Sequence, residues 1–146
     1  MSSIVLLLLT LALGAGQTAA PAAGSMRARL SPVPTDLAMH ETIAGTGAAT
    51  ATLAGTTLTV EGTYQGLKSA ATVVRVFDSP QPGLRGPLVG EFASGGGTRG
   101  TFKGTVTLTR EQAAAYAKGL LYVQLHSEKA ADGNLWGWLM AAKGRR

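Results

Sequence analysis

Hydrophobic and polar residues alternate with a period of two along much of the chain after residue 48. In residues 49–53 and 57–64, alanine, leucine, valine and tyrosine alternate with threonine and glutamate, and Gly55 and Thr56 between them have the composition of a tight turn. Successive side chains of a strand point to opposite faces, so this pattern predicts a half-buried β-hairpin.

The same period predicts strands along the rest of the chain, each bounded by glycine, proline or short polar residues; they cover residues 71–77, 88–93, 102–108, 121–126 and 135–139. We expect residues 88–93 to form an edge strand. In the last pair, Leu121, Val123 and Leu125 face one side, and Asp132-Gly133 is the predicted turn.

One helix interrupts the strands. Thr109 can act as its N-cap with Gln112 as the capping-box partner, and Gly119 is placed to end it. We expect this short helix to connect two sheets. About seven or eight strands with one helix predict an all-β domain, either a two-sheet sandwich or a barrel.

Residues 1–24 carry no charged side chain, and an apolar run that includes Ile4, Leu8 and Leu13 is followed by small residues. This composition is typical of a secretory signal peptide. If the segment is retained, the same residues predict a membrane anchor, although the apolar run is short for a span of about 20 residues.

Three further segments follow from composition. We expect residues 25–36 to form a linker because Pro32 and Pro34 oppose regular structure, residues 37–141 to form the β-sandwich, and residues 142–146 to form a basic tail. We expect the protein to be exported to the periplasm or the extracellular space, with membrane contact only through residues 1–24.

Charge and composition narrow the function classes. The formal net charge is +5, but the only tight basic cluster is Lys143, Arg145 and Arg146, so the sequence lacks the basic stripe with interleaved aromatics that nucleic-acid binding needs. The chain has no cysteine, which excludes disulfides and thiolate metal sites.

Motifs for catalysis are weak. The sequence has no Gly-x-Ser-x-Gly nucleophile elbow. Gly95, Gly97 and Gly100 match the dinucleotide-binding glycine spacing, but no helix is predicted after them to receive phosphates, so a hairpin loop is the better interpretation. We therefore predict a non-enzymatic protein without a cofactor.

Three stretches carry a resemblance to a known family: residues 49–72 (ATATLAGTTLTVEGTYQGLKSAAT), 104–128 (GTVTLTREQAAAYAKGLLYVQLHSE) and 132–139 (DGNLWGWL). In order and spacing they resemble the chordin-repeat (CHRD) domain family. The resemblance implies a Greek-key β-sandwich found in secreted bacterial proteins and extracellular regulators. It also implies a binding or structural module, since the family has no well-established enzymatic activity.

The chain departs from the family pattern at informative positions. Many bacterial members carry two histidines, one residue apart, where this chain has Arg75 and Phe77, and Trp136 replaces a usual arginine. Of the histidines that invite a metal site in those members, only His126 is present. We expect Arg75, Phe77 and His126 to share one face of neighbouring strands.

His126 is a weak candidate for a metal ligand, because zinc or copper needs three or four ligands and His40 is the only other imidazole. The simpler alternative is a hydrogen-bonded structural histidine at a strand end, and a third is contact with a partner. The metal-ligand alternative corresponds to a periplasmic metal-binding or redox-associated protein.

Trp136 and Trp138 share a face of the last predicted strand, opposite Leu135 and Leu139. Packing in the core is one explanation for two indoles. The other is contact with a partner, because the leucines mark the more obvious core face, and aromatics beside arginine are typical of binding hot spots.

We therefore expect a module that docks on another protein, as an accessory subunit on the outer face of a membrane complex if residues 1–24 are retained. The predicted partner-binding residues are Phe77 and Arg75 on one strand, Tyr122 on the next, and Trp136 and Trp138 on the last. Replacing Trp136 by alanine is predicted to weaken the partner complex more than it lowers the melting temperature.

Overall fold

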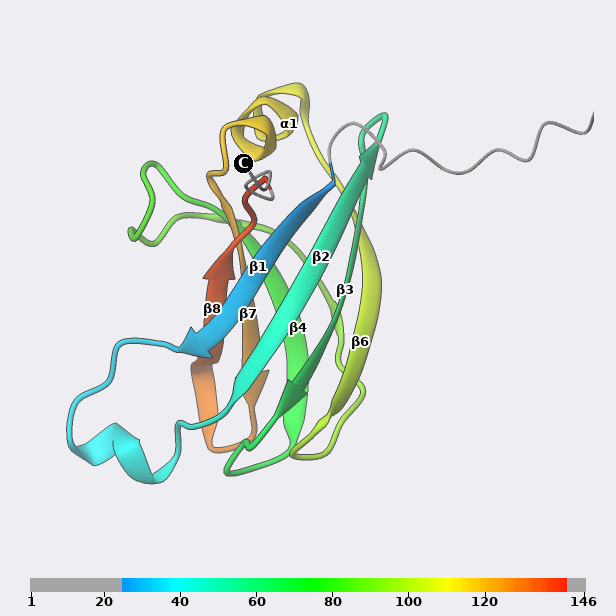
Figure 1. Cartoon of the computed structure of the whole chain (residues 1–146). Helices are drawn as coiled ribbons and strands as arrows, with labels where there is room; N and C mark the ends of the chain where they lie inside the picture. Colours follow the sequence, from blue (N-terminus) through cyan, green and yellow to red (C-terminus); the bar gives the residue numbers. More distant parts are fainter. Residues whose placement is uncertain (1–24, 142–146) are drawn as a thin grey trace, which may run out of the picture.

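The structure, a computed structural model, describes residues 25–141, and within them it has eight strands, one α-helix and one 3-10 helix (Figure 1). This confirms the predicted all-β fold with one short helix. The elements in chain order are β1 (Met26–Pro32), η1 (Ala38–Glu41), β2 (Thr46–Ala54), β3 (Thr57–Gln65), β4 (Ala71–Asp78), β5 (Leu88–Ala93), β6 (Gly100–Thr107), α1 (Arg110–Ala117), β7 (Leu121–Ser127) and β8 (Ala130–Trp138).

All neighbouring strands are antiparallel, in the order β5-β4-β7-β8-β1-β2-β3-β6. We call β1, β2, β3 and β6 sheet A, and β5, β4, β7 and β8 sheet B. Strand β1 joins the two sheets, since residues 26–30 pair with β2 while Ser31 and Pro32 pair with β8. The chain crosses between the sheets from β3 to β4, from β5 to β6 and from β6 to β7, in the manner of a Greek key.

The sheet is nearly closed, because its two end strands, β5 and β6, lie against each other without pairing. Side chains fill this seam. A Cβ built on Gly104 of β6 would lie 2.1 Å from Cγ of Phe92, and one built on Gly90 of β5 would lie 2.6 Å from Val106. Glycine at these two positions lets each strand accept a large side chain from the other.

The core lies between the sheets and follows the predicted alternation. Leu121, Val123 and Leu125 of β7 are fully buried, and so are Leu135 and Leu139 across from them. The inward side chains of the other strands complete it, with Leu30, Ala49, Ala51, Leu58, Val60, Val74, Val76, Phe102 and Val106 among them. The sequence-based assignment of the core face of the closing hairpin is confirmed.

Helix α1 has the predicted ends. The Thr109 side chain accepts a hydrogen bond from the Gln112 backbone N–H (3.2 Å), the Gln112 side chain accepts one from the Thr109 N–H (2.9 Å), and Gly119 follows with a positive φ. The buried Tyr116 donates its hydroxyl to the carbonyl of Ala51 (3.2 Å), which fixes the helix over the end of the sandwich. As predicted, α1 connects the two sheets.

The predicted linker at residues 25–36 is wrong for most of its length, because β1 is the strand that joins the two sheets. Met26, Ala28 and Leu30 are buried there and alternate with exposed residues. Pro32 falls at the last position of β1, where loss of a backbone donor is tolerated. The domain therefore includes β1, from Met26, and does not begin near Leu37.

The predicted turn of the closing hairpin at Asp132-Gly133 is also wrong, because the turn lies at Glu128 and Lys129. Gly133 is inside β8, and a Cβ there would lie 1.8 Å from the side-chain nitrogen of Gln124. That nitrogen donates a hydrogen bond to the carbonyl of Asp132 (2.7 Å). The glycine lets the Gln124 side chain cross the neighbouring strand.

Candidate functional site

The outer side of sheet B carries a row of apolar side chains that runs across its four strands. Strand register places Leu88 of β5 opposite Phe77 of β4, Phe77 opposite Tyr122 of β7, and Tyr122 opposite Trp138 of β8. With Trp136, two positions earlier on β8, these five residues form what we call the aromatic face. Outward positions of a sandwich are usually polar, so an apolar row here is unusual.

The rings of the aromatic face are in mutual contact. Phe77 stacks on Tyr122 with centroids 5.0 Å apart, and Tyr122 lies 4.8 Å from Trp138. Trp136 meets Trp138 edge to face at 4.8 Å and Tyr122 at 5.8 Å. Tyr122 is only 1% exposed, Phe77 and both tryptophans are half-buried, and Leu88 is 50% exposed. Tyr122 is thus a support beneath the surface, while the other four residues reach it.

The loop of residues 79–87, between β4 and β5, folds back over this face. The hydroxyl of Tyr122 accepts a hydrogen bond from the backbone N–H of Gly86 (3.3 Å). The exposed Arg85 places its guanidinium 5.6 Å from the ring centroid of Trp136, within the range of a cation–π contact. The cation beside the tryptophans is therefore Arg85, a residue that sequence reasoning did not select.

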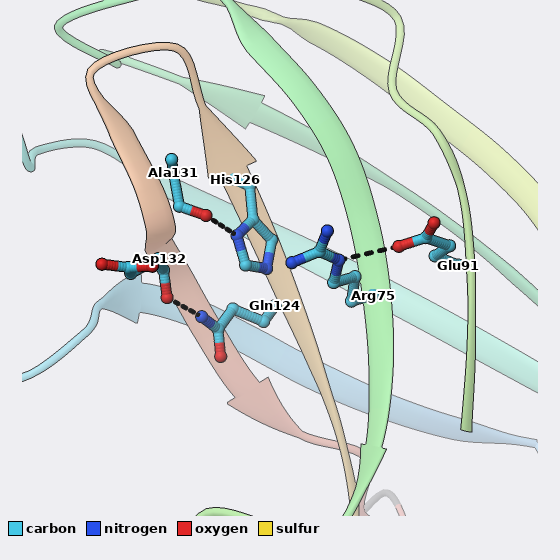
Figure 2. A network of polar contacts seen from close by, with 6 residues as sticks. All are labelled: Arg75, Glu91, Gln124, His126, Ala131 and Asp132. Carbon is cyan, nitrogen blue, oxygen red and sulfur yellow. Dashed lines mark hydrogen bonds and ion pairs between the residues drawn. The ribbon is translucent and has the colours of Figure 1, made fainter. Parts of the chain in front are cut away.

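Arg75 lies on the same side of sheet B but in the next row. In the strand register Arg75 lies opposite Gln124, and Gln124 lies between Arg75 and Trp136. The Nε atom of Arg75 is 2.7 Å from a carboxylate oxygen of Glu91 (Figure 2). The structure thus places all five predicted partner-binding residues on one side of the sheet, four of them in contact with one another. Arg75 stands apart from this group, bound to Glu91.

His126 is buried on the same side of β7, beyond Gln124. Its Nδ1 lies 2.8 Å from the carbonyl oxygen of Ala131 (Figure 2). A carbonyl only accepts hydrogen bonds, so Nδ1 carries the proton. Nε2 of His126 and Oε1 of Gln124 are buried and have no hydrogen-bond partner among residues 25–141. His126 is therefore hydrogen-bonded through Nδ1, while the lone pair of Nε2 has no partner in the described part of the chain.

Burial lowers the pKa of His126 below its ordinary value of 6.5, and the positive charge of Arg75 lowers it further. The hydrogen bond to Ala131 and the charges of Asp132 and Glu91 act in the opposite direction but do not reverse the shift. The imidazole is consequently neutral at neutral pH.

A metal site would need further ligands near His126. Within residues 25–141, no group of three or more His, Asp or Glu side chains gathers in a way that could hold a metal ion. The sandwich has another candidate surface on sheet A, a hollow of about 490 Å³ whose walls include Thr50, Thr63 and Lys103. None of the predicted site residues lines that hollow.

The comparison with family models gives one match, to the CHRD domain, over residues 18–139. The match covers most of the chain, including every strand and the helix. The chain belongs to the CHRD domain family. Searches of curated proteins and of solved structures found no match.

Membership of the CHRD family confirms the resemblance seen in the sequence and indicates a small non-catalytic binding module. Ile4, Leu8 and Leu13, the candidate anchor residues, lie outside the part of the chain that the structure describes, as does the basic tail. In the described part, no helix has the length and apolar composition needed to cross a membrane.

Two further features of the CHRD domain's outer side were not predicted. Arg85 lies within the 79–87 loop and Leu88 follows it directly, and the Gly and Pro content of this loop predicts only irregular structure. Residues 33–45 pack beside Trp136 through the buried side chains of Val33 and Ile43. Residues 33–45 also contain Leu37 and Met39, so the sequence does not show which apolar residues of this segment are buried or what they contact.

Proposed function

We propose that this CHRD domain is an exported, non-enzymatic module that docks on another protein through the aromatic face. The observation that carries the proposal is the difference between the two outer sides of one sandwich. On sheet A, the outward positions of β3 and β6 hold Thr57, Thr59, Glu61, Thr63, Thr101, Lys103, Thr105 and Thr107. On sheet B, the outward positions hold the aromatic face beside a polar group made by Arg75, Glu91, Gln124 and His126.

The composition of the aromatic face supports protein binding. Tryptophan, tyrosine and arginine are the residues most enriched in binding hot spots, and Trp136 and Arg85 are combined here in one contact. Leu84 and Leu88, 51% and 50% exposed, add apolar surface around the rings. The ring contacts beneath hold this surface in one arrangement, which lowers the entropy lost on binding.

Residues 1–24 bear on where docking occurs. If they are removed, we expect a free periplasmic or extracellular protein. If they are retained, the sandwich would sit as an accessory subunit on the outer face of a membrane complex. The intact mass of the exported protein separates these cases. A mass equal to that of the whole chain from Met1 rules out cleavage.

Affinity capture from solubilised membranes and from the exported fraction tests the docking proposal. We would compare the wild-type chain with Leu88→Ser, whose side chain is half exposed and contributes little to the core. The matched control is Thr105→Ala, an exposed outward position on the other end strand, β6. We expect Leu88→Ser to lower retention of the captured partner about tenfold. Equal retention by wild type, Leu88→Ser and the control would contradict the proposal.

A further inference from the structure

Two segments border the aromatic face at opposite ends of sheet B: residues 33–45, which contain η1 and which we call the thumb, and the loop of residues 79–87 (Figure 1). Both project beyond the strands on the same side of the molecule. Their charges are opposite. The thumb contains two carboxylates, Asp36 and Glu41, and no lysine or arginine, whereas the loop contains Arg85 and no acidic residue.

The thumb is held in a fixed position. Asn134 is fully buried. Its side-chain oxygen accepts a hydrogen bond from the backbone N–H of Ala44 (3.2 Å), and its backbone carbonyl accepts one from the N–H of Val33 (2.9 Å). The side-chain nitrogen of Asn134 also donates to the hydroxyl of Ser127 (2.9 Å). These bonds tie both ends of the thumb to sheet B.

The tip of this fixed segment exposes apolar side chains. Leu37 is 90% exposed and Met39 is 37% exposed. Within the tip, Asp36 accepts a hydrogen bond from the Met39 N–H through its side chain (3.0 Å). A leucine held out into water on an ordered segment gains free energy when a partner covers it.

The loop of residues 79–87 presents the complementary chemistry. The buried hydroxyl of Ser79 donates a hydrogen bond to the carbonyl of Leu84 (2.7 Å), and Gly86 is bonded to Tyr122. These contacts hold Leu84 and Arg85 outward beside the aromatic face. Each border of the face therefore offers one exposed leucine, with negative charge at one border and positive charge at the other.

We propose that the aromatic face takes a second copy of this chain, packed face to face and antiparallel about a twofold axis. The inference rests on the proposed function, because it names an occupant of the same face. In this arrangement the thumb of each copy meets the 79–87 loop of the other, so Glu41 faces Arg85 twice. A twofold interface repeats every favourable contact, which suits a surface whose two ends complement each other.

The test measures the molar mass of the purified full-length protein by light scattering over a concentration series. We expect the mass to double as concentration rises. Arg85→Glu places two acidic groups together in both symmetric contacts, and Glu41→Lys places two basic groups together. Each variant alone should raise the dimer dissociation constant at least about tenfold. Asp36 is left unchanged because its carboxylate holds the turn of the thumb.

Mixing the two variants gives the sharpest result. In a mixed dimer, one contact is the native Glu41–Arg85 pair and the other is a reversed lysine–glutamate pair, so attraction returns at both ends. We expect the equimolar mixture to recover the doubled mass. Lys103→Glu on the outer side of sheet A is the control and should leave association unchanged, since that side chain lies on the other face.

A protein that stays monomeric at every concentration overturns the inference. A doubled mass that persists in both Arg85→Glu and Glu41→Lys also overturns it. The copies would then associate through another part of the chain, such as residues 1–24. The proposed function fails separately: a monomer that still captures another protein in a Leu88-dependent way rejects the second copy but retains the docking face.

Discussion

Replacing Trp136 by alanine removes the residue on which the aromatic face and the thumb meet. Its indole contacts the rings of Tyr122 and Trp138 edge to face, lies under the guanidinium of Arg85, and packs on a small buried cluster made by Val33, Ile43 and Ala130. The side chain is nevertheless half-buried, so a part of it is free for a partner.

The loss of stability can be worked from these contacts. Two aromatic pairs contribute about 0.5–1.5 kcal/mol each, and an exposed cation–π contact contributes about 0.5–1 kcal/mol. Loss of apolar contact with Val33 and Ile43 adds to this sum. We therefore expect Trp136→Ala to lower the free energy of unfolding by about 3 kcal/mol, the low end for a large aromatic because part of the ring is exposed.

Urea unfolding followed by the fluorescence of the remaining Trp138 measures this loss. Trp136→Phe, which keeps a ring in contact with Tyr122, should lose only about 1 kcal/mol. A loss below about 1 kcal/mol for Trp136→Ala would refute the reasoning, because the contacts described could not then be stabilising. Because this variant changes stability as well as surface, weaker partner binding by it is ambiguous, and Leu88→Ser is the cleaner probe of docking.

Three further predictions concern the seam, the thumb and the buried histidine. Gly104→Ala should cost about 1–3 kcal/mol in urea unfolding, because the new methyl group meets the Phe92 ring, and the cost should largely vanish in a Phe92→Ala background. Asn134→Ala should cost about 2–3 kcal/mol and speed hydrogen exchange at the Ala44 amide, which loses its buried acceptor; unchanged exchange would contradict the anchoring. The folded-state pKa of His126 is lowered, so the unfolded chain binds a proton first as pH falls below 6.5, and stability should decrease over the range down to the folded-state pKa. His126→Asn, which keeps a donor for Ala131, should show a smaller loss of stability in thermal unfolding as pH falls below 6.5, and an equal loss would exclude His126 as its source.

Most of the fold could be predicted because strand periodicity and helix capping are local signals. Leu121, Val123 and Leu125 marked the core face of β7, and Thr109 with Gln112 marked the start of α1, since both patterns depend on residues a few positions apart. Strand β1 carries the same alternation in Met26, Ala28 and Leu30, but Pro32 and Pro34 favour a linker.

The site was predictable in part. Phe77, Tyr122 and the two tryptophans were selected because they occupy outward strand positions, and the register brings them together. The arginine beside them could not be chosen from sequence, because the path of the 79–87 loop depends on a long-range hydrogen bond to Tyr122. The sequence predicts a turn at Gly133 because glycine is typical both of turns and of positions that a side chain approaches closely.

The central claim, docking through the aromatic face, is tested most directly by measuring how much partner is retained by wild type, Leu88→Ser and Thr105→Ala. The three chains are compared side by side, after equal thermal stability has been checked. Both positions are exposed and outward on the end strands of the sheet, and they differ in the side of the sandwich they occupy. If the aromatic face is the docking surface, only Leu88→Ser loses the partner. Loss with Thr105→Ala and retention with Leu88→Ser would place the docking surface on sheet A and contradict the account.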